Sequence, residues 1–224
     1  MTRKLWALGA SIFILTLILN VPAALVARLF DWPSGWQPQG VSGTVWSGQA
    51  QSVGEIGPLV WRLRPWMGQG ELSAGYQQQA WDLTIDGWPW SWRAQLMPGA
   101  PLVTPASSYA LDGHWQGKLD IRGRGSRCTA SEGELSGQDM ALLSPWMMVL
   151  GNATLRLDCR DGVQLLAEVR REGEHRFDVR LLPFARRASI SGQVEPEASV
   201  TPLLIQAGML KAGESRFEKT LGKR

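Results

Sequence analysis

Hydrophobic and polar positions divide the chain into two parts with different patterns. Residues 5–27 carry no charged side chain; Arg3 and Lys4 precede them and Arg28 follows. A helix over this segment would be about 35 Å long at 1.5 Å per residue, enough to cross a hydrocarbon core of roughly 30 Å. No uncharged segment of similar length follows Arg28. The rest of the chain is therefore expected on one side of a single membrane.

Two interpretations of residues 5–27 stay open. In the first, the segment is a cleaved signal peptide with its cleavage site among the small residues near Ala24. In the second, it is an uncleaved signal anchor, which the continuation of the apolar run beyond Pro22 favours. We therefore expect residues 1–4 in the cytoplasm by the positive-inside rule, residues 5–29 as a transmembrane signal anchor, and the remainder outside the cytoplasm.

Beyond a Pro- and Gly-rich linker at residues 30–39, apolar and polar positions alternate in short runs. Leu59, Trp61 and Leu63, for example, would lie on one face of an extended segment. Such runs, separated by turn-forming residues, predict roughly a dozen short strands. The sequence thus predicts an all-β domain over residues 40–210, built as an antiparallel meander.

The predicted domain divides into two loosely similar halves, residues 40–98 and 105–197, because the stretch between them is rich in proline. Residues 140–150 and 200–210 are apolar and are expected to form the only helical segments of this domain. Residues 211–224 are expected to form a polar, partly disordered tail.

Composition agrees with this strand-rich interpretation. The chain has 12 Trp, 25 Gly and 13 Pro, a mixture that suits strands and turns better than long helices. Its net charge of +3 comes from scattered positive and negative residues, which argues against a nucleic-acid partner. Trp88, Trp90 and Trp92 would share one face of an extended segment. We interpret this face as core, with a groove for a ligand or partner as the alternative.

The two cysteines, Cys128 and Cys159, are expected to form a disulfide, because paired cysteines are usual outside the cytoplasm. No CxxC motif or His/Cys cluster points to a metal or redox site. The only histidines, His114 and His175, lie in alternating segments and are interpreted as surface or structural residues. No GxSxG motif, phosphate-binding glycine loop or carboxylate cluster is present. The sequence therefore predicts a protein that is not an enzyme and has no cofactor, metal or small-molecule substrate.

Three segments, taken in order, resemble one protein family. Residues 40–48 (GVSGTVWSG) follow the anchor, residues 61–72 (WRLRPWMGQGEL) come next, and residues 203–208 (LLIQAG) precede Arg216 and Phe217 near the end. In this arrangement they resemble the type II secretion system protein N family, also called general secretion pathway protein N. The resemblance spans nearly the whole chain.

This resemblance implies a single-pass protein of the cell inner membrane with a β-rich periplasmic domain, to which a curved antiparallel sheet would correspond. It also implies an accessory role in the machinery that exports folded proteins across the outer membrane, with other components of that machinery as partners. The family has no catalytic residues to carry over. The alternative is a periplasmic lipid-handling protein with an apolar trough, whereas an envelope enzyme is disfavoured by the missing catalytic residues.

Overall fold

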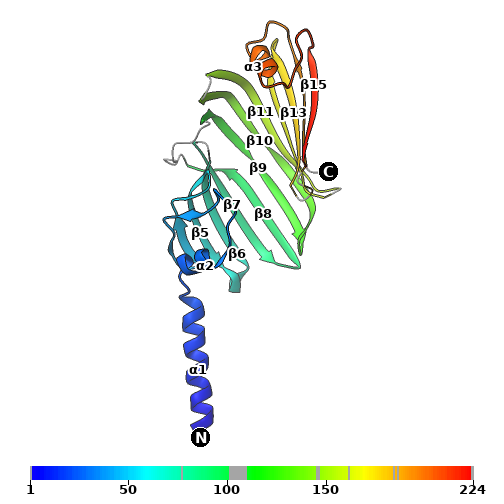
Figure 1. The fold of residues 1–224 in the computed structure, drawn as a ribbon. Helices are drawn as coiled ribbons and strands as arrows, with labels where there is room; N and C mark the ends of the chain where they lie inside the picture. Colours follow the sequence, from blue (N-terminus) through cyan, green and yellow to red (C-terminus); the bar gives the residue numbers. More distant parts are fainter. Residues whose placement is uncertain are drawn as a thin grey trace.

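A computed structural model describes residues 2–76, 78–100, 110–144, 147–160, 162–183, 185 and 187–222. It confirms the predicted all-β class: the chain forms one large antiparallel sheet of 15 strands with few helices (Figure 1). From β5 to β15 the strands pair in sequence order, so the sheet is the predicted meander.

The helical elements are α1 (Thr2–Leu19), α2 (Ala23–Leu29), the 3₁₀ turn η1 (Pro65–Met67) and α3 (Thr201–Gln206). The strands are β1 (Pro38–Gln39), β2 (Ser42–Gly43), β3 (Ser47–Ala50), β4 (Ser52–Val53), β5 (Ile56–Arg64), β6 (Gln69–Tyr76), β7 (Gln79–Trp88), β8 (Ser91–Pro98), β9 (Ala110–Arg124), β10 (Arg127–Ser144), β11 (Met148–Asp158), β12 (Gln164–Arg171), β13 (His175–Leu182), β14 (Arg187–Val194) and β15 (Arg216–Gly222).

The N-terminal apolar segment is two helices and not the single helix that its composition predicts. Pro22 is extended, with φ −67° and ψ 130°, and it has no N–H to continue the ladder of α1. The sheet also holds the chain at this break, because the Val45 N–H donates to the Val21 carbonyl at 3.0 Å. The Trp46 Nε1–H donates to the Ile18 carbonyl at 2.8 Å. No helix in the described part of the chain is both long and apolar enough to be a candidate membrane span.

The two predicted halves are parts of one continuous sheet. β8 and β9 pair across the expected boundary, with Leu96 opposite Leu119. The boundary was expected at residues 99–104, of which 101–104 lie outside the described residues. The segment 140–150, expected to be helical, is shared between β10 and β11, with residues 145–146 outside the described part.

The C-terminal tail is ordered where disorder was expected. It contributes β15, which pairs with β14 and buries Phe217. The expected helix over residues 200–210 is confirmed in part as α3. A hydrophobic cluster joins this helix and its flanking turns to β13, β14 and β15 through Phe177, Val194, Ala198, Val200, Leu204, Leu210 and Phe217. Burial of Phe217 is the reason that a polar sequence can form an ordered strand.

The predicted disulfide between Cys128 and Cys159 is present, with Cα atoms 5.4 Å apart. It joins the start of β10 to the residue that follows β11, beside the paired strands β10 and β11. The bridge therefore closes a loop of 31 residues that contains both strands.

Replacing both cysteines, as Cys128→Ser with Cys159→Ser, should lower the free energy of unfolding by about 3–4 kcal/mol, because the unfolded chain regains loop entropy. Urea unfolding of the full chain measures this loss. Reductant should destabilise the wild-type protein to the level of the variant and leave the variant unchanged. Equal stability of oxidised wild type and variant would contradict the expectation.

Candidate binding surfaces

One face of the sheet is apolar from β5 to β14, and we call it the apolar face. It contains two rows of directly opposed side chains, since successive strands pair in a register that keeps them in line. The first row, on β5 to β9, is Trp61, Leu72, Leu83, Leu96 and Leu119. The second, on β10 to β14, is Leu135, Leu155, Ala167, Val179 and Ile190.

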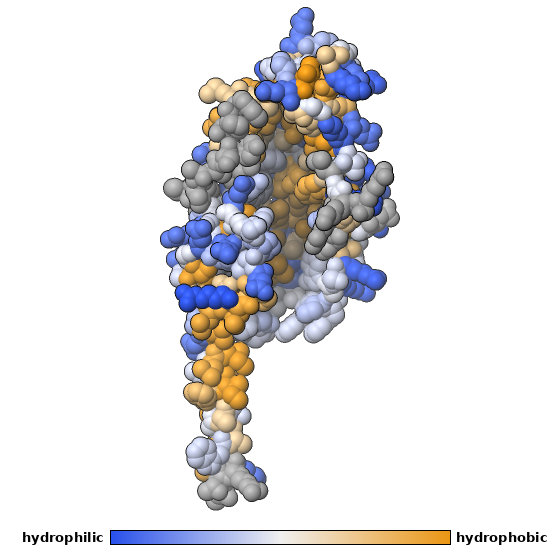
Figure 2. All heavy atoms as spheres, viewed as in Figure 1, coloured by the Kyte–Doolittle hydropathy of each residue, from blue (hydrophilic) through white to orange (hydrophobic). Residues whose placement is uncertain are grey.

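The apolar face lines the hollow of the curved sheet. Figure 2 shows orange side chains along the inside of this hollow. In the two rows Leu119 and Leu135 are fully buried, at 1% and 0% exposure, whereas Leu83 and Leu96 are half-buried. An apolar surface that stays partly open to solvent in the isolated chain is a candidate surface for binding an apolar partner.

At the N-terminal end, α2 and its flanking segments close part of the apolar face into a cavity of about 320 Å³. Its walls are Ala23, Val26, Ala27, Phe30, Trp32, Pro38, Val41, Val45, Ala50, Val53, Leu59 and Trp61. The one buried polar group of the Trp61 side chain is satisfied, because its Nε1–H donates to the carbonyls of Thr44 and Val45 at 3.2 and 3.1 Å. The Trp61 N–H therefore has no free hydrogen-bonding capacity, and the cavity suits a ligand made of apolar groups.

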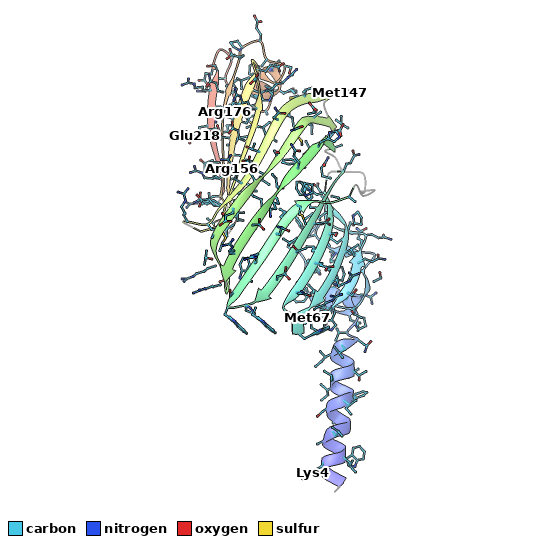
Figure 3. All side chains as sticks on the ribbon, turned by 180° about the vertical axis from the view of Figure 1, so that it is seen from behind. Lys4, Met67, Met147, Arg156, Arg176 and Glu218 are labelled. Atoms are coloured by element: carbon cyan, nitrogen blue, oxygen red, sulfur yellow. A yellow bond between two sulfur atoms is a disulfide. The ribbon has the colours of Figure 1, made fainter. Side chains whose placement is uncertain are left out.

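The opposite face of the sheet is polar and carries cross-strand ion pairs. Figure 3, from behind, shows Arg156, Arg176 and Glu218 on this side. The pairs are Arg62–Glu71, Arg122–Glu132, Arg156–Glu134 and Arg176–Glu168, with nitrogen–oxygen distances of 2.5–3.5 Å. All of these side chains are well exposed, so each pair stabilises the fold only slightly.

Two carboxyl groups on this polar side have lowered pKa values. Hydrogen bonds from Lys118 and Gln95 lower the pKa of Asp120. Arg160 lowers the pKa of Asp158 to about 2, since its guanidinium donates to both carboxylate oxygens. These groups stay ionised at neutral pH and provide no proton for acid–base chemistry.

The prediction that Trp88, Trp90 and Trp92 share one core face is wrong. Pro89 and Trp90 form the turn between β7 and β8, so the chain reverses between the first and third indoles. Trp88 and Trp90 stack at 5.5 Å and are 44% and 68% exposed. Trp92 alone lies on the apolar face, where its ring packs over Gly123 and its Nε1–H donates to the Gly125 carbonyl at 2.9 Å.

Of the two histidines, interpreted from the sequence as surface or structural residues, His175 is buried and structural. It is 4% exposed and stacks on Phe177 with ring centroids 4.7 Å apart. Its Nε2 lies 3.2 Å from the Leu150 carbonyl, which fixes the proton on that nitrogen, while Nδ1 is buried without a partner among the described residues. Burial lowers the pKa of His175, and the hydrogen bond to Leu150 only partly offsets this. His114 is exposed, as predicted.

β15 is the long free edge of the sheet, since in the described chain it pairs with β14 alone. Val194 N–H donates to the Ser215 carbonyl at 2.8 Å, so these opposed residues form a hydrogen-bonded pair. The alternation of antiparallel pairs then turns the backbone groups of Phe217 and Lys219 toward β14. Those of Arg216, Glu218 and Thr220 point outward, where another strand can pair with them.

The described residues contain no group of three or more His, Cys, Asp or Glu side chains placed to hold a metal ion. Comparison with protein-family models, with curated proteins and with solved structures gives no significant match for this chain. The function is therefore inferred from the residues and surfaces of this chain.

The neutral, buried His175 predicts a pH-dependent stability. The unfolded chain binds a proton at the usual pKa near 6.5, whereas the folded chain takes it up only at lower pH. The unfolded state then binds more protons, so unfolding free energy should fall as pH drops from about 7.5 toward 5.5. Urea unfolding across this range should show the fall in wild type and in the control His114→Gln. The fall in unfolding free energy should be smaller in His175→Gln. An equal fall in that variant would contradict the assignment of the pH dependence to His175.

Proposed function

We propose that this protein is a non-enzymatic accessory of the type II secretion machinery, anchored in the inner membrane by α1 and acting through protein contacts in the periplasm. The observation that carries this proposal is the resemblance of residues 40–48, 61–72 and 203–208 to the protein N family. The fold adds a physical link between these segments.

The two N-terminal segments of the resemblance are packed against each other. Gly48 is directly opposite Trp61, and Trp61 is opposite Leu72. A Cβ atom at position 48 would lie 2.5 Å from Cζ2 of Trp61, so only glycine fits beneath this indole. The glycine of the first segment and the tryptophan of the second are thus required together, which supports treating them as one motif.

The C-terminal segment of the resemblance also packs against the residues that follow it. Leu204, from α3, and Phe217, from β15, belong to one hydrophobic cluster. In Figure 1 α3 lies at the end of the molecule opposite α1. The resembling segments therefore close the two ends of the sheet, where the apolar face would otherwise be exposed.

The chemistry of α1 supports the membrane anchor. Its large apolar side chains are exposed all round, from Leu19 at 42% to Trp6 at 81%. The Ser11 and Thr16 hydroxyls donate to the carbonyls of Ala7 and Ile12, so polar groups are satisfied within the helix. Its 18 residues measure about 27 Å, and a bilayer can thin locally to match such a length.

The β15 edge is the surface proposed for the protein contact. Strand addition to a free edge takes its affinity from main-chain hydrogen bonds. Outward-facing amides at Arg216, Glu218 and Thr220 supply the donors, and no ion pair occupies Arg216 or Glu218 among the described residues.

Glu218→Pro tests this function at the edge. Proline removes the outward N–H of residue 218 and leaves the ladder to β14 intact, because that N–H does not face β14. In a strain whose own copy is deleted, the variant should restore secretion poorly, with the exported enzymes accumulating in the periplasm. The measurement is enzyme activity in the medium and in the periplasm.

Glu218→Ala is the matched control, since it removes the same side chain but keeps the amide. It should restore secretion as well as wild type. Equal restoration by both variants would overturn the role of the edge, and normal secretion in the deletion strain under all conditions would overturn the proposed function itself.

A lipid-handling role is the second candidate, and the open apolar face with its open-sided apolar pocket favours it. A cavity of about 320 Å³ is within the range of small-ligand sites, and acyl chains need no polar partners. The two functions predict different contents for the hollow: a lipid for this candidate, and none for the secretion accessory.

Photo-crosslinking from adjacent positions separates the two candidates. Leu83 faces the hollow and Thr84 faces the opposite side of β7, and both are half-buried. A photoreactive phenylalanine analogue at position 83 should give lipid adducts in mass spectra of the full chain, whereas the analogue at position 84 should not. Absence of lipid at both positions would contradict the lipid-handling role.

A further inference from the structure

The turns at the end of the sheet nearest α1 share an unusual set of exposed side chains. Trp66 and Met67 form the turn between β5 and β6 and are 59% and 56% exposed. Trp88 and Trp90 flank the next turn on this side and are 44% and 68% exposed. We call these four side chains the aromatic rim. Indoles this exposed add nothing to the core of the sheet, so their conformations need another explanation.

Short contacts connect the aromatic rim to the last turn of α1. The Trp46 indole donates to the Ile18 carbonyl at 2.8 Å and packs against the Trp66 ring at 6.4 Å. The Gly87 N–H donates to the Gly68 carbonyl at 2.8 Å, which joins the turn of Trp66 to that of Trp88. Figure 3 shows Met67 beside the upper end of α1.

Positive charge continues the same edge of the sheet. Arg64 precedes η1, and Arg124 and Arg127 flank the turn between β9 and β10, where the Gly125 N–H donates to the Pro89 carbonyl at 2.5 Å. All three arginines are exposed, and none forms an ion pair within the described residues. Asp86, the acidic residue of β7 nearest these turns, is likewise without an ion pair there.

The other end of the same strands has a different character. The turn between β6 and β7 carries glutamines, Gln78 and Gln79, in place of tryptophans and arginines. Among the described turns that join β5 to β8, exposed indoles therefore lie on the side from which α1 projects (Figure 1).

We propose that the aromatic rim rests on the surface of the membrane that α1 enters. Tryptophan prefers the bilayer interface, and arginine is attracted to anionic lipid headgroups. A contact with lipid fits these residues better than a contact with a protein strand, because they lie at hairpin ends, where the backbone already pairs within each hairpin, as in Arg64–Gln69, Trp88–Ser91 and Arg124–Arg127. This inference rests on the proposed anchoring by α1. Contact of the aromatic rim with the membrane would hold the sheet upright, with α3 far from the membrane.

Fluorescence quenching by brominated lipid tests the contact in the full chain in nanodiscs. The quenched part of the tryptophan emission should fall in the double variant Trp88→Phe, Trp90→Phe, because two lipid-contacting indoles are lost. Trp92→Phe is the matched control: its indole is half-buried on the apolar face, so the quenched part should stay unchanged.

Trp6→Phe separates this inference from the anchor, since Trp6 lies on α1. Loss of quenching in Trp6→Phe but not in the double variant would overturn the rim contact and keep the anchor. No loss in either would overturn both. Arg124→Gln with Arg127→Gln should reduce quenching in discs of anionic lipid and not in neutral discs; an equal effect in both would overturn the headgroup role of these arginines.

Discussion

Register along the antiparallel ladder is the constraint on which the structure depends. Side chains alternate with a period of two, so a slip of one residue would move a whole strand's apolar set to the other face. β10 shows how the register is kept over a strand of 18 residues. Leu135 and Gly137 face the hollow, and a shift between Gly137 and Met140, with Asp139 at φ 53°, restores the phase. Met140 is therefore buried at 3% exposure although its parity differs from that of Leu135.

A wide one-sided sheet also needs closure at its ends, and the chain uses two helices for this. α3 covers the last strands through a hydrophobic cluster, and α2 covers the first through the cavity walls. α2 comes from the apolar stretch that sequence alone assigns to a membrane. Ala23 is 7% exposed against the sheet, whereas Leu25 on the same short helix is 56% exposed. One apolar segment is thus divided into a helix that packs against the sheet and a helix that projects away from it, with Pro22 at the point of division.

Much of the fold follows from the sequence, and the misplaced elements share a cause. Alternation predicts the strands, and the hairpin turn at Gly173 follows from its residue type because glycine adopts positive φ freely, whereas Gln78 adopts a positive φ that its residue type does not favour. The cysteine pair was predicted from an expected location outside the cytoplasm, and the disulfide is present. Periodicity assigns faces but does not show where a chain reverses, so the even spacing of Trp88, Trp90 and Trp92 was misleading. Pro89, between two of these indoles, was the available signal for the turn.

A bare strand edge such as β15 can pair with strands of other molecules and so promote aggregation. β15 places Lys219 on the apolar-face side, opposite Ile190, where a charge would oppose a second apolar strand. Its ammonium is held by the Gly208 carbonyl next to α3, which keeps the charge at one place. The same edge carries Arg216 and Glu218 on the polar side. A strand that pairs here must accept a fixed cation on one face and two opposite charges on the other. This requirement excludes the apolar strands that cause aggregation, and leaves the outward amides of β15 for a partner of complementary charge.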